Sequence, residues 1–316
     1  MEVFSGPLAD VMADFVSFKR MQGYDYCSQA KALERFDRFL LEQECSGGLL
    51  RHEHFERYVV LTEGLCAGWR ENLLSVVREF SRYLNSHDPK SVIVPQRLLP
   101  RHRRRRRFYR MEPAQIRSLM DAAIVLNMRH PVGPQAIRFL IGLLYCTGLR
   151  ISEALKLNLG DLDLGRGTIF VRKGKFGKDR LVALAQSTTV EINRWLKLRS
   201  GYAGDGASSP LLIGSANGRL TYTLAKQRFV GLCKGCGLDG EPAPRLHDLR
   251  HNFACSCIAR WRNEGKDIQT LLPVLANAMG HVNIFATQIY IHMEAAAFDH
   301  ASAQFHRQFI QQQEED

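Results

Sequence analysis

The sequence predicts a mainly α-helical protein of two domains, with a small antiparallel β-hairpin or sheet in the second. Three observations support this fold class. Residues 1 to about 88 repeat apolar side chains every three or four positions, without a strand pattern. A stretch rich in proline and arginine then marks a linker. Beyond it, two β-rich runs flank a basic, glycine-containing turn within an otherwise helical pattern.

The first domain is expected over residues 1–90. Its helical spacing occurs in four stretches: LADVMADFVSFKRM, SQAKALERFDRFLLEQ, HFERYVVLTEG and RENLLSVVREFSRYLNS. Such spacing places the apolar side chains on one face of each helix, so the four helices can share a core. We therefore expect a compact four-helix domain.

Residues 91–110 are expected to form a basic linker. Seven of the ten residues from Arg101 to Arg110 are arginine. A run of this kind can be a solvated charged arm or a nuclear-localisation signal. Because it joins two folded halves, we favour an arm along a phosphate backbone, which adds affinity and little sequence specificity. The candidate DNA-binding residues are Arg103, Arg104, Arg105, Arg106 and Arg107.

The second domain is expected over residues 111–316. Pro113 stands where a first helical turn tolerates proline. The apolar stretch PQAIRFLIGLLYCTGLRISEALKL predicts helix with a break at Gly148. The segment GTIFVRKGKFGKDRLVALA predicts a hairpin, and PLLIG can form a short strand. The remainder predicts mainly helix, including an amphipathic tail.

Composition narrows the class of protein. Hydrophobic residues make up 45% of the 316 residues, enough for packed cores. No run of 18 apolar residues is present, and the first residues do not fit a secretory signal, so we expect a cytoplasmic protein. The net charge of +11 favours a polyanionic partner such as DNA or RNA.

The eight cysteines are typical of reduced intracellular thiols. Cys233 and Cys236, followed by Cys255 and Cys257, approach the spacing of a zinc ribbon. The second pair is separated by one residue within a helical run, so its side chains would point to different faces. We therefore expect no metal site, with structural zinc as the alternative.

Four short segments of the second domain carry reactive side chains: TGLRISE, GKFGKDR, LHDLRHNFA and GHVNIFATQIY. His247 and Arg250 are three residues apart and share a helix face. Arginine forks from two segments can clamp one phosphate and neutralise charge that builds up in a transition state. A tyrosine such as Tyr290 can act as a nucleophile if nearby cations lower its effective pKa. These groups suffice for metal-free attack on a phosphodiester.

Other chemistries lack their motifs. A two-metal nuclease needs several converging carboxylates, and the acidic residues near these segments show no metal-ligand pattern. The sequence has no G-x-x-x-x-G-K-[ST] phosphate loop. It also has no G-x-S-x-G nucleophile elbow.

The four segments resemble the tyrosine recombinase (phage integrase) family. That family has an arginine in a TGLR-x-x-E box, a lysine in a β-hairpin, H-x-x-R, and then G-H with a tyrosine nine residues on. All these elements occur here in the same order, over residues 111 to about 295. The resemblance implies a two-domain DNA clamp, made of a helical core-binding (SAM-like) domain and a tyrosine recombinase catalytic domain.

The resemblance also implies catalytic roles. Tyr290 would attack the scissile phosphate and form a 3′-phosphotyrosyl link. Arg150 and Arg250 would hold the non-bridging oxygens. Lys175, which fits the family's hairpin better than its neighbouring lysines, would protonate the leaving 5′ oxygen. No metal or ATP would be needed, because the covalent link preserves the phosphodiester energy.

Four further residues have implied supporting roles. His247 would assist proton transfer at the tyrosine, and His281 would hydrogen-bond the phosphate. Glu153 would brace the active-site arginine. His251 matches a common family residue and can support the site or only its packing.

The resulting hypothesis is a site-specific recombinase, integrase or transposase of a bacterial mobile element. It would act on double-stranded DNA as a homotetramer, with accessory recombinase or DNA-bending proteins possible and the nucleoid as its place of action. The alternatives are a type IB topoisomerase-like enzyme and a catalytically silent DNA-binding regulator. One departure from many relatives is the longer segment between Arg250 and His281, which is expected to lengthen a loop or helix.

Overall fold

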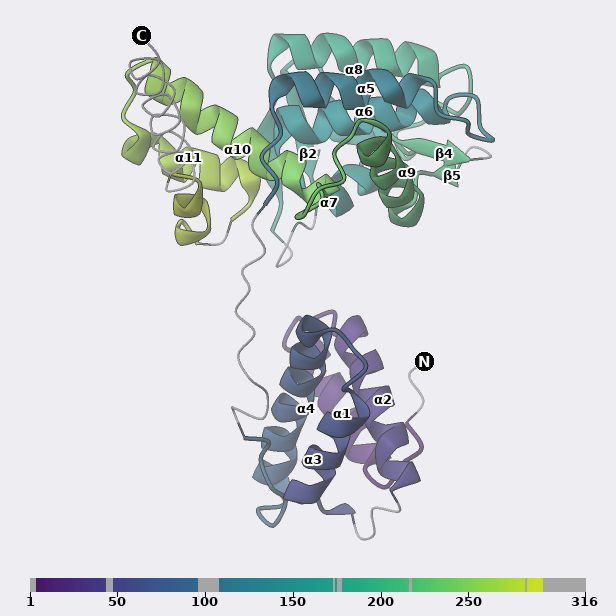
Figure 1. Cartoon of the computed structure of the whole chain (residues 1–316), viewed down its shortest axis with the longest axis vertical. Coiled ribbons are helices and arrows are strands. Elements are labelled where there is room, and N and C mark those ends of the chain that lie inside the picture. The colour runs from purple at the N-terminus through teal and green to yellow at the C-terminus, as the bar shows by residue number, and fades with distance from the viewer. Residues whose placement is uncertain are drawn as a thin grey trace, which may run out of the picture. The chain divides into compact units, whose positions relative to one another are not determined.

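The computed structural model describes residues 4–43, 48–95, 108–172, 174, 178–215, 218–281 and 283–291. The chain divides into two compact units, residues 1–105 and residues 106–316 (Figure 1). Each unit has its own hydrophobic core.

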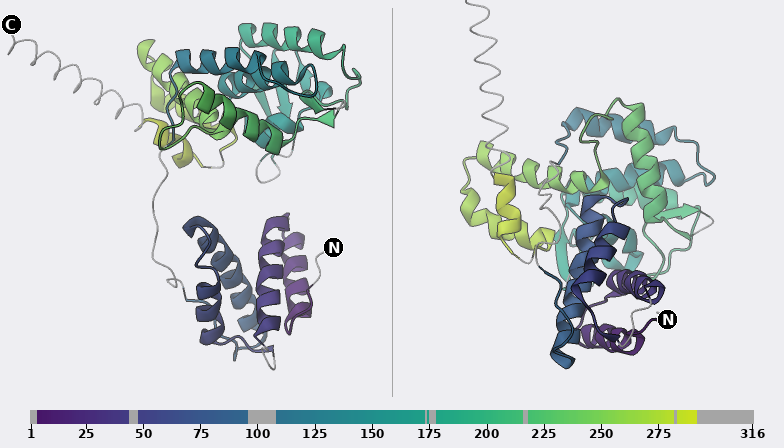
Figure 2. Two further views of the ribbon diagram at one scale, coloured as in Figure 1. Left: turned by 45° about the vertical axis from the view of Figure 1, so that its right-hand side comes forward. Right: turned by 60° about the horizontal axis from the view of Figure 1, so that its bottom comes forward.

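The first unit is a bundle of four helices, which coincide with the four stretches of helical spacing. They are α1 (Ala9–Met21), α2 (Cys27–Glu42), α3 (His52–Leu61) and α4 (Ala67–His87). Figure 2 shows the helices of this bundle from two further sides. Aromatic side chains fill its core. Phe15 packs edge-on against Phe80 with ring centroids 5.6 Å apart, and Phe36 does so against Tyr58 at 4.9 Å. Aromatic rings prefer this edge-to-face geometry, so these pairs stabilise the packing of the four helices.

The second unit combines helices with two small antiparallel sheets, as the sequence predicts. Its helices are α5 (Pro113–Ile124), α6 (Gly133–Thr147), α7 (Ile151–Lys156), the 3₁₀ turn η2 (Leu159–Asp161), α8 (Gln186–Arg199), α9 (Tyr222–Gly235), α10 (Leu246–Asn263) and α11 (Ile268–Met279). Its strands are β1 (Leu162–Asp163), β2 (Thr168–Val171), β3 (Arg180–Ala183), β4 (Ile213–Ser215) and β5 (Gly218–Arg219). Residues 285–291 form a last helical segment.

The predicted hairpin is the β2–β3 pair, in which Ile169 lies opposite Val182. Strand β1 adds a third strand that the sequence did not indicate, because it is only two residues long. Ile169 and Val171 alternate with more exposed residues and face the core, as a half-buried strand requires. The two strands of the hairpin therefore have a fixed apolar base in the core.

Helix α6 is the centre of the main core of this unit. Its buried residues include Leu140, Ile141 and Leu144, each fully buried, and it packs against α5, α8 and α10. Figure 1 shows α5, α6 and α8 running alongside one another. A helix that is apolar on most sides belongs inside a core, which explains its mainly hydrophobic sequence.

A second, smaller core joins the distal part of α10, helix α11 and residues 285–291. Its buried members are Ala254, Cys255, Ile258, Leu272, Leu275, Met279 and Tyr290. Both figures show α10 and α11 at one end of the unit, with β4 and β5 at the other. The long segment after Arg250 therefore lengthens α10 as far as Asn263 and continues, after a short turn, into α11.

The zinc-ribbon alternative finds no support in the placement of the cysteines. Cys233 lies in the main core, whereas Cys255 lies in the smaller one. Across the part of the chain that the structure describes, no group of three or more histidine, cysteine or acidic residues is placed to hold a metal ion. Within the same residues, no helix combines the length and apolar character that crossing a bilayer requires.

Asn252 attaches the start of the second unit to α10. Its Oδ1 accepts from the Met111 amide at 2.9 Å, and its Nδ2 donates to the Tyr109 and Asp248 carbonyls. Asn252→Ala leaves the buried Met111 N–H without a partner, so we expect the free energy of unfolding to fall by roughly 1–3 kcal/mol. Urea unfolding followed by circular dichroism measures this. The exposed Asn193, which also donates to a helix carbonyl, is the matched control, and an equal loss in Asn193→Ala contradicts the prediction.

Candidate active site

Arg150 is fixed at the break between α6 and α7. Gly148 ends α6 with a left-handed conformation (φ 63°), and a Cβ there would collide with the Phe253 ring, so glycine is required. Arg150 then caps α7: both its backbone N–H and its Nη1 donate to Glu153, each at 2.8 Å. The TGLR-x-x-E pattern is therefore a local fold that holds an arginine against a carboxylate.

Glu153 is a buried carboxylate that also binds Arg180 from β3. Arg180 donates from Nη1 and Nη2 to the two carboxylate oxygens at 2.9 and 2.8 Å. Burial alone would raise the pKa of Glu153, but the hydrogen bonds from Arg180 and Arg150 lower it to about 2. Glu153 is therefore ionised at neutral pH and shared by two arginines.

Arg250 comes from the first turns of α10 and is 2% exposed. Its Nη1 donates to the Gly148 carbonyl at 2.7 Å and its Nη2 to the Met279 carbonyl at 2.6 Å. Burial and the neighbouring Arg150 lower its pKa to about 10, so it remains a cation at neutral pH. Arg250 thus connects the end of α6 with the end of α11.

The C-terminus of α11 is where the three arginines meet. The carbonyls of Ala278, Met279 and Gly280 accept from Arg180, Arg250 and Arg150 at 2.9, 2.6 and 2.8 Å, respectively. These carbonyls form the negative end of the helix dipole and have no partner within the helix. Three arginines from three separate elements therefore supply donors to the carbonyls at the end of α11. These bonds hold the three guanidinium groups close together.

Tyr290 lies beside this cluster and is 2% exposed. Its hydroxyl is hydrogen-bonded to His251 Nδ1 at 2.8 Å. Burial raises the pKa of Tyr290 to about 12, against the opposing charges of Arg250 and Arg150. In the described state the tyrosine is therefore a neutral phenol.

His251 is part of a cluster of aromatic rings. The His247 ring contacts it edge-on at 4.7 Å between centroids, and Phe108 contacts it at 5.4 Å. Burial and the adjacent His247 lower the pKa of His251 to about 4. Desolvation and Arg250 also lower the pKa of His247, although its side chain still reaches solvent. The structure therefore places His251, rather than His247, at the tyrosine hydroxyl.

His281 covers the other side of the tyrosine. The two rings are stacked with centroids 6.3 Å apart and an interplanar angle of 18°. His281 Nδ1 is hydrogen-bonded to the Thr287 hydroxyl at 2.7 Å. Burial and the charges of Arg250 and Arg150 lower the pKa of His281 to about 4, so its ring is neutral at pH 7.

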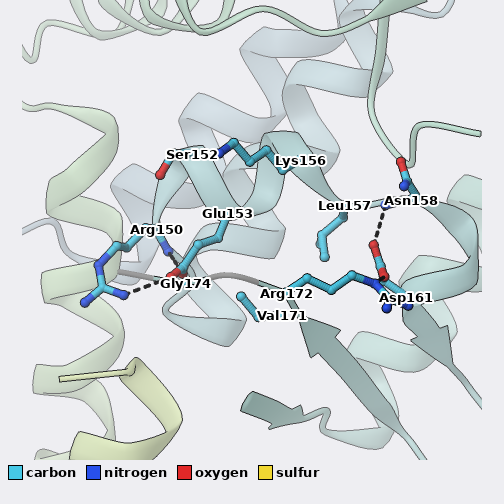
Figure 3. A pocket seen from close by; sticks show the side chains of 10 residues that line it. All are labelled: Arg150, Ser152, Glu153, Lys156, Leu157, Asn158, Asp161, Val171, Arg172 and Gly174. Atoms are coloured by element: carbon cyan, nitrogen blue, oxygen red, sulfur yellow. Dashed lines mark hydrogen bonds and ion pairs between the residues drawn. The ribbon is translucent and has the colours of Figure 1, made fainter. Parts of the chain in front are cut away.

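A cavity of about 550 Å³ opens beside Arg150. Figure 3 shows Arg150 on the left of it, Lys156 above, and Arg172 reaching toward Asp161 on the right. Arg172 donates to Asp161 at 2.7 Å. The position of the cavity next to Arg150 and Glu153 makes it a continuation of the arginine cluster toward the hairpin.

The structure brings together seven of the residues that the sequence singled out, namely Arg150, Glu153, His247, Arg250, His251, His281 and Tyr290. Lys175 and the linker arginines, Arg103 to Arg107, lie outside the described residues. The sequence prediction missed Arg180, although it belongs to the quoted GKFGKDR segment. One signal for Arg180 was available in the sequence, since it stands two residues after Lys178 at the start of a strand.

Comparison with known proteins identifies the family. The sequence model of the phage integrase family matches residues 109–297. The chain belongs to the phage integrase family. A Sinorhizobium fredii protein named as an integrase/recombinase, y4rE, is 31% identical over 291 residues, covering 92% of this chain and 93% of that protein. A second, y4rB, is 37% identical over 225 residues, covering 69% and 72%.

A solved structure has the same fold. The Tn1549 transposon integrase in complex with transposon right end DNA gives a TM-score of 0.61 at 20% identity, covering 93% of this chain and 98% of that chain. The fold prediction is therefore confirmed, and so is the prediction of a tyrosine-type site-specific DNA recombinase.

Gly280 of this recombinase is expected to tolerate no side chain. It has φ 65°, and a Cβ would lie 2.9 Å from Arg180 Cζ. Gly237 has a similar φ of 70° with no neighbour within 4 Å, so it is a matched control. Either change to alanine should cost about 1–2 kcal/mol of stability through backbone strain. Only Gly280→Ala should lose further stability and DNA cleavage; equal behaviour in thermal unfolding and cleavage assays contradicts this.

The stability of this recombinase should fall as pH falls from about 6.5 to about 4. In that window His251 and His281 take up protons when unfolded but resist them when folded, because the folded pKa of each is about 4. Urea midpoints measured between pH 4 and 7.5 give the slope. His251→Asn and His281→Gln should each flatten it, whereas His52→Gln on the exposed start of α3 should not. An unchanged slope in both site variants contradicts the prediction.

Proposed function

We propose that this recombinase cuts and rejoins double-stranded DNA through a 3′-phosphotyrosyl link to Tyr290, without metal or ATP. The observation that carries the proposal is the hydroxyl of Tyr290, held by a histidine beside a cluster of arginines. Such a cluster supplies the positive charge that a phosphoryl-transfer transition state needs. The tyrosine supplies the nucleophile.

Arg150 and Arg250 would hold the non-bridging oxygens of the scissile phosphate. A guanidinium carries five N–H donors, and the described contacts of each arginine leave some of these for a ligand. Because the carbonyls of α11 and Gly148 fix both side chains, little rearrangement is needed when charge develops on the phosphate. Glu153 would keep Arg150 in this orientation.

The proton of Tyr290 would pass to His251, to which the hydroxyl is already hydrogen-bonded. His247 lies against His251 and would assist this transfer. The low pKa of His251 in the free protein reflects burial and neighbouring positive charge. A bound phosphodiester would offset that charge and raise the pKa of His251 toward neutrality, where a general base is most effective.

The remaining steps would complete a balanced transesterification. The Tyr290 oxygen forms a bond to phosphorus while the bond to the 5′ oxygen breaks, and Lys175 donates a proton to that oxygen. His281 would donate a hydrogen bond to the phosphate. Attack by a 5′ hydroxyl on the phosphotyrosine reverses these steps and seals the strand, so the energy of the broken bond is retained.

The DNA-binding parts would be arranged along the chain. Residues 1–90 would form the core-binding domain, residues 91–110 a basic arm in which Arg103 to Arg107 follow the phosphates, and residues 111–316 the catalytic domain. The net charge of +11 supports binding to a polyanion. Two domains on one duplex would form a clamp, and paired sites would be joined by a homotetramer, assisted by accessory proteins in the bacterial cytoplasm. The solved Tn1549 integrase complex with transposon DNA supports action on a mobile element.

A nicked suicide substrate tests the proposal. Duplexes are tiled across the DNA around the gene, each nicked at a different position. A duplex whose nick lies near the cleavage site releases the leaving strand and traps the covalent complex. Wild-type protein should trap DNA in the presence of EDTA, and Tyr290→Phe should trap none. Tyr222→Phe, which alters an exposed tyrosine on α9, is the matched control and should trap normally.

Two outcomes contradict the proposed chemistry, and a third bears on strand exchange alone. Trapping by Tyr290→Phe would remove the tyrosine from its assigned role. Loss of trapping in EDTA would indicate a metal mechanism. Relaxation of supercoiled DNA without strand exchange between two sites would instead favour the topoisomerase-like alternative.

A further inference from the structure

Arg180 is a buried arginine without an assigned role. It begins β3, and only 8% of its side chain is exposed. Its three bonded nitrogens all have internal acceptors, since Nη1 and Nη2 bind Glu153 and Nε binds the Ala278 carbonyl. Because all three guanidinium nitrogens bind internal acceptors, we expect any effect of Arg180 on the reaction to pass through its neighbours.

Glu153 is the neighbour that transmits this effect. Oε1 accepts from Nη1 of Arg150 and Nη1 of Arg180, whereas Oε2 accepts from the Arg150 amide and Nη2 of Arg180. These four bonds occupy the acceptor sites of a carboxylate. Each carboxylate oxygen is therefore shared between the two arginines. The orientation of the Glu153 carboxylate toward Arg150 consequently depends on Arg180.

Arg180 also contacts the two backbone segments that flank the site. A Cβ at Gly280 would lie 2.9 Å from its guanidinium, and one at Gly174 would lie 3.1 Å from its Nη1. Gly280 precedes His281, and Gly174 precedes Lys175 in the hairpin. Arg180 thus packs against the residues next to two proposed catalytic groups.

We propose that Arg180 is a positioning residue for DNA cleavage, because it fixes Glu153 and thereby the guanidinium of Arg150. The inference rests on the proposed function, which assigns Arg150 to the scissile phosphate. On this inference Arg180 acts through Glu153 and not through a contact with DNA. Its removal should therefore slow the chemical step and leave DNA affinity unchanged.

The test compares Arg180→Gln and Arg180→Lys with wild type in single-turnover cleavage of the nicked duplex, with protein in excess. Arg180→Gln should cleave about 10- to 100-fold more slowly, because small misplacements of a catalytic group have effects of this size. Arg180→Lys should recover part of the rate, since a point charge replaces the fork. Affinity, measured by gel shift, should match wild type in both variants.

Arg194→Gln is the matched control. Arg194 pairs with Glu191 on α8 and is 71% exposed, so its loss removes one positive charge from the surface. We expect wild-type cleavage from this variant. Thermal unfolding of every variant checks folding, and Arg180→Lys, which keeps the charge, carries the test if Arg180→Gln does not fold.

The pH profile separates positioning from a loss of packing. The charged groups around Glu153 among the described residues are Arg150, Arg180 and Arg250. Without Arg180, burial raises the pKa of Glu153 toward the assay range. The cleavage rate of Arg180→Gln should then fall more steeply than that of wild type as pH drops from 8 to about 5.5. This additional fall should vanish in the double variant with Glu153→Gln.

Each outcome has one consequence. Wild-type rates across the pH range for Arg180→Gln overturn the inference while the proposed function stands. A loss of affinity equal to the loss of rate also overturns it, because Arg180 would then act in binding. If the additional fall in cleavage rate at low pH persists in the double variant with Glu153→Gln, Arg180 does not act through Glu153. Failure of the wild type to trap DNA overturns the proposed function, and the inference with it.

Discussion

The end of helix α11 is the constraint on which the site depends. Arg150, Arg180 and Arg250 come from positions up to 100 residues apart in sequence, and each donates to one of its last three carbonyls. Three guanidinium groups would repel one another in a bare cavity. The helix dipole and the carboxylate of Glu153 offset this repulsion, so the positive charge is in place before any phosphate binds. The site is therefore assembled by backbone acceptors as much as by side chains.

The same arrangement joins the two cores of the second unit. Arg250 bonds to Gly148 at the end of α6, which belongs to the main core, and to Met279 in the smaller core. Among the described residues, the segment that carries Tyr290 packs in the smaller core. Helix α10 also spans both cores, with Leu249 in the main one and Ile258 in the smaller one, and it packs against α6. The position of the tyrosine thus depends on α10 together with the arginine hydrogen bonds.

The sequence predicted most of the elements and the main site residues, since helical spacing, the hairpin and the family motifs are local patterns. It did not predict which histidine meets the tyrosine. His247 and His251 are four residues apart on one helix face, and only the direction from which residues 285–291 approach selects His251. Arg180 was missed for a similar reason. A basic residue beside a basic turn is usually solvated. Arg180 is instead largely buried, because it contacts Glu153 and the end of α11, which are distant from it in sequence.

The burial of Tyr290 has a further consequence for specificity. With 2% of its surface exposed and its hydroxyl hydrogen-bonded to His251, Tyr290 is covered by the protein in this structure. If it is the proposed nucleophile, this cover would withhold it from stray phosphodiesters. Its exposure to a scissile phosphate would then need free energy from DNA binding. Discrimination between target and non-target DNA would operate at this step, even where the arginines bind any phosphate equally well.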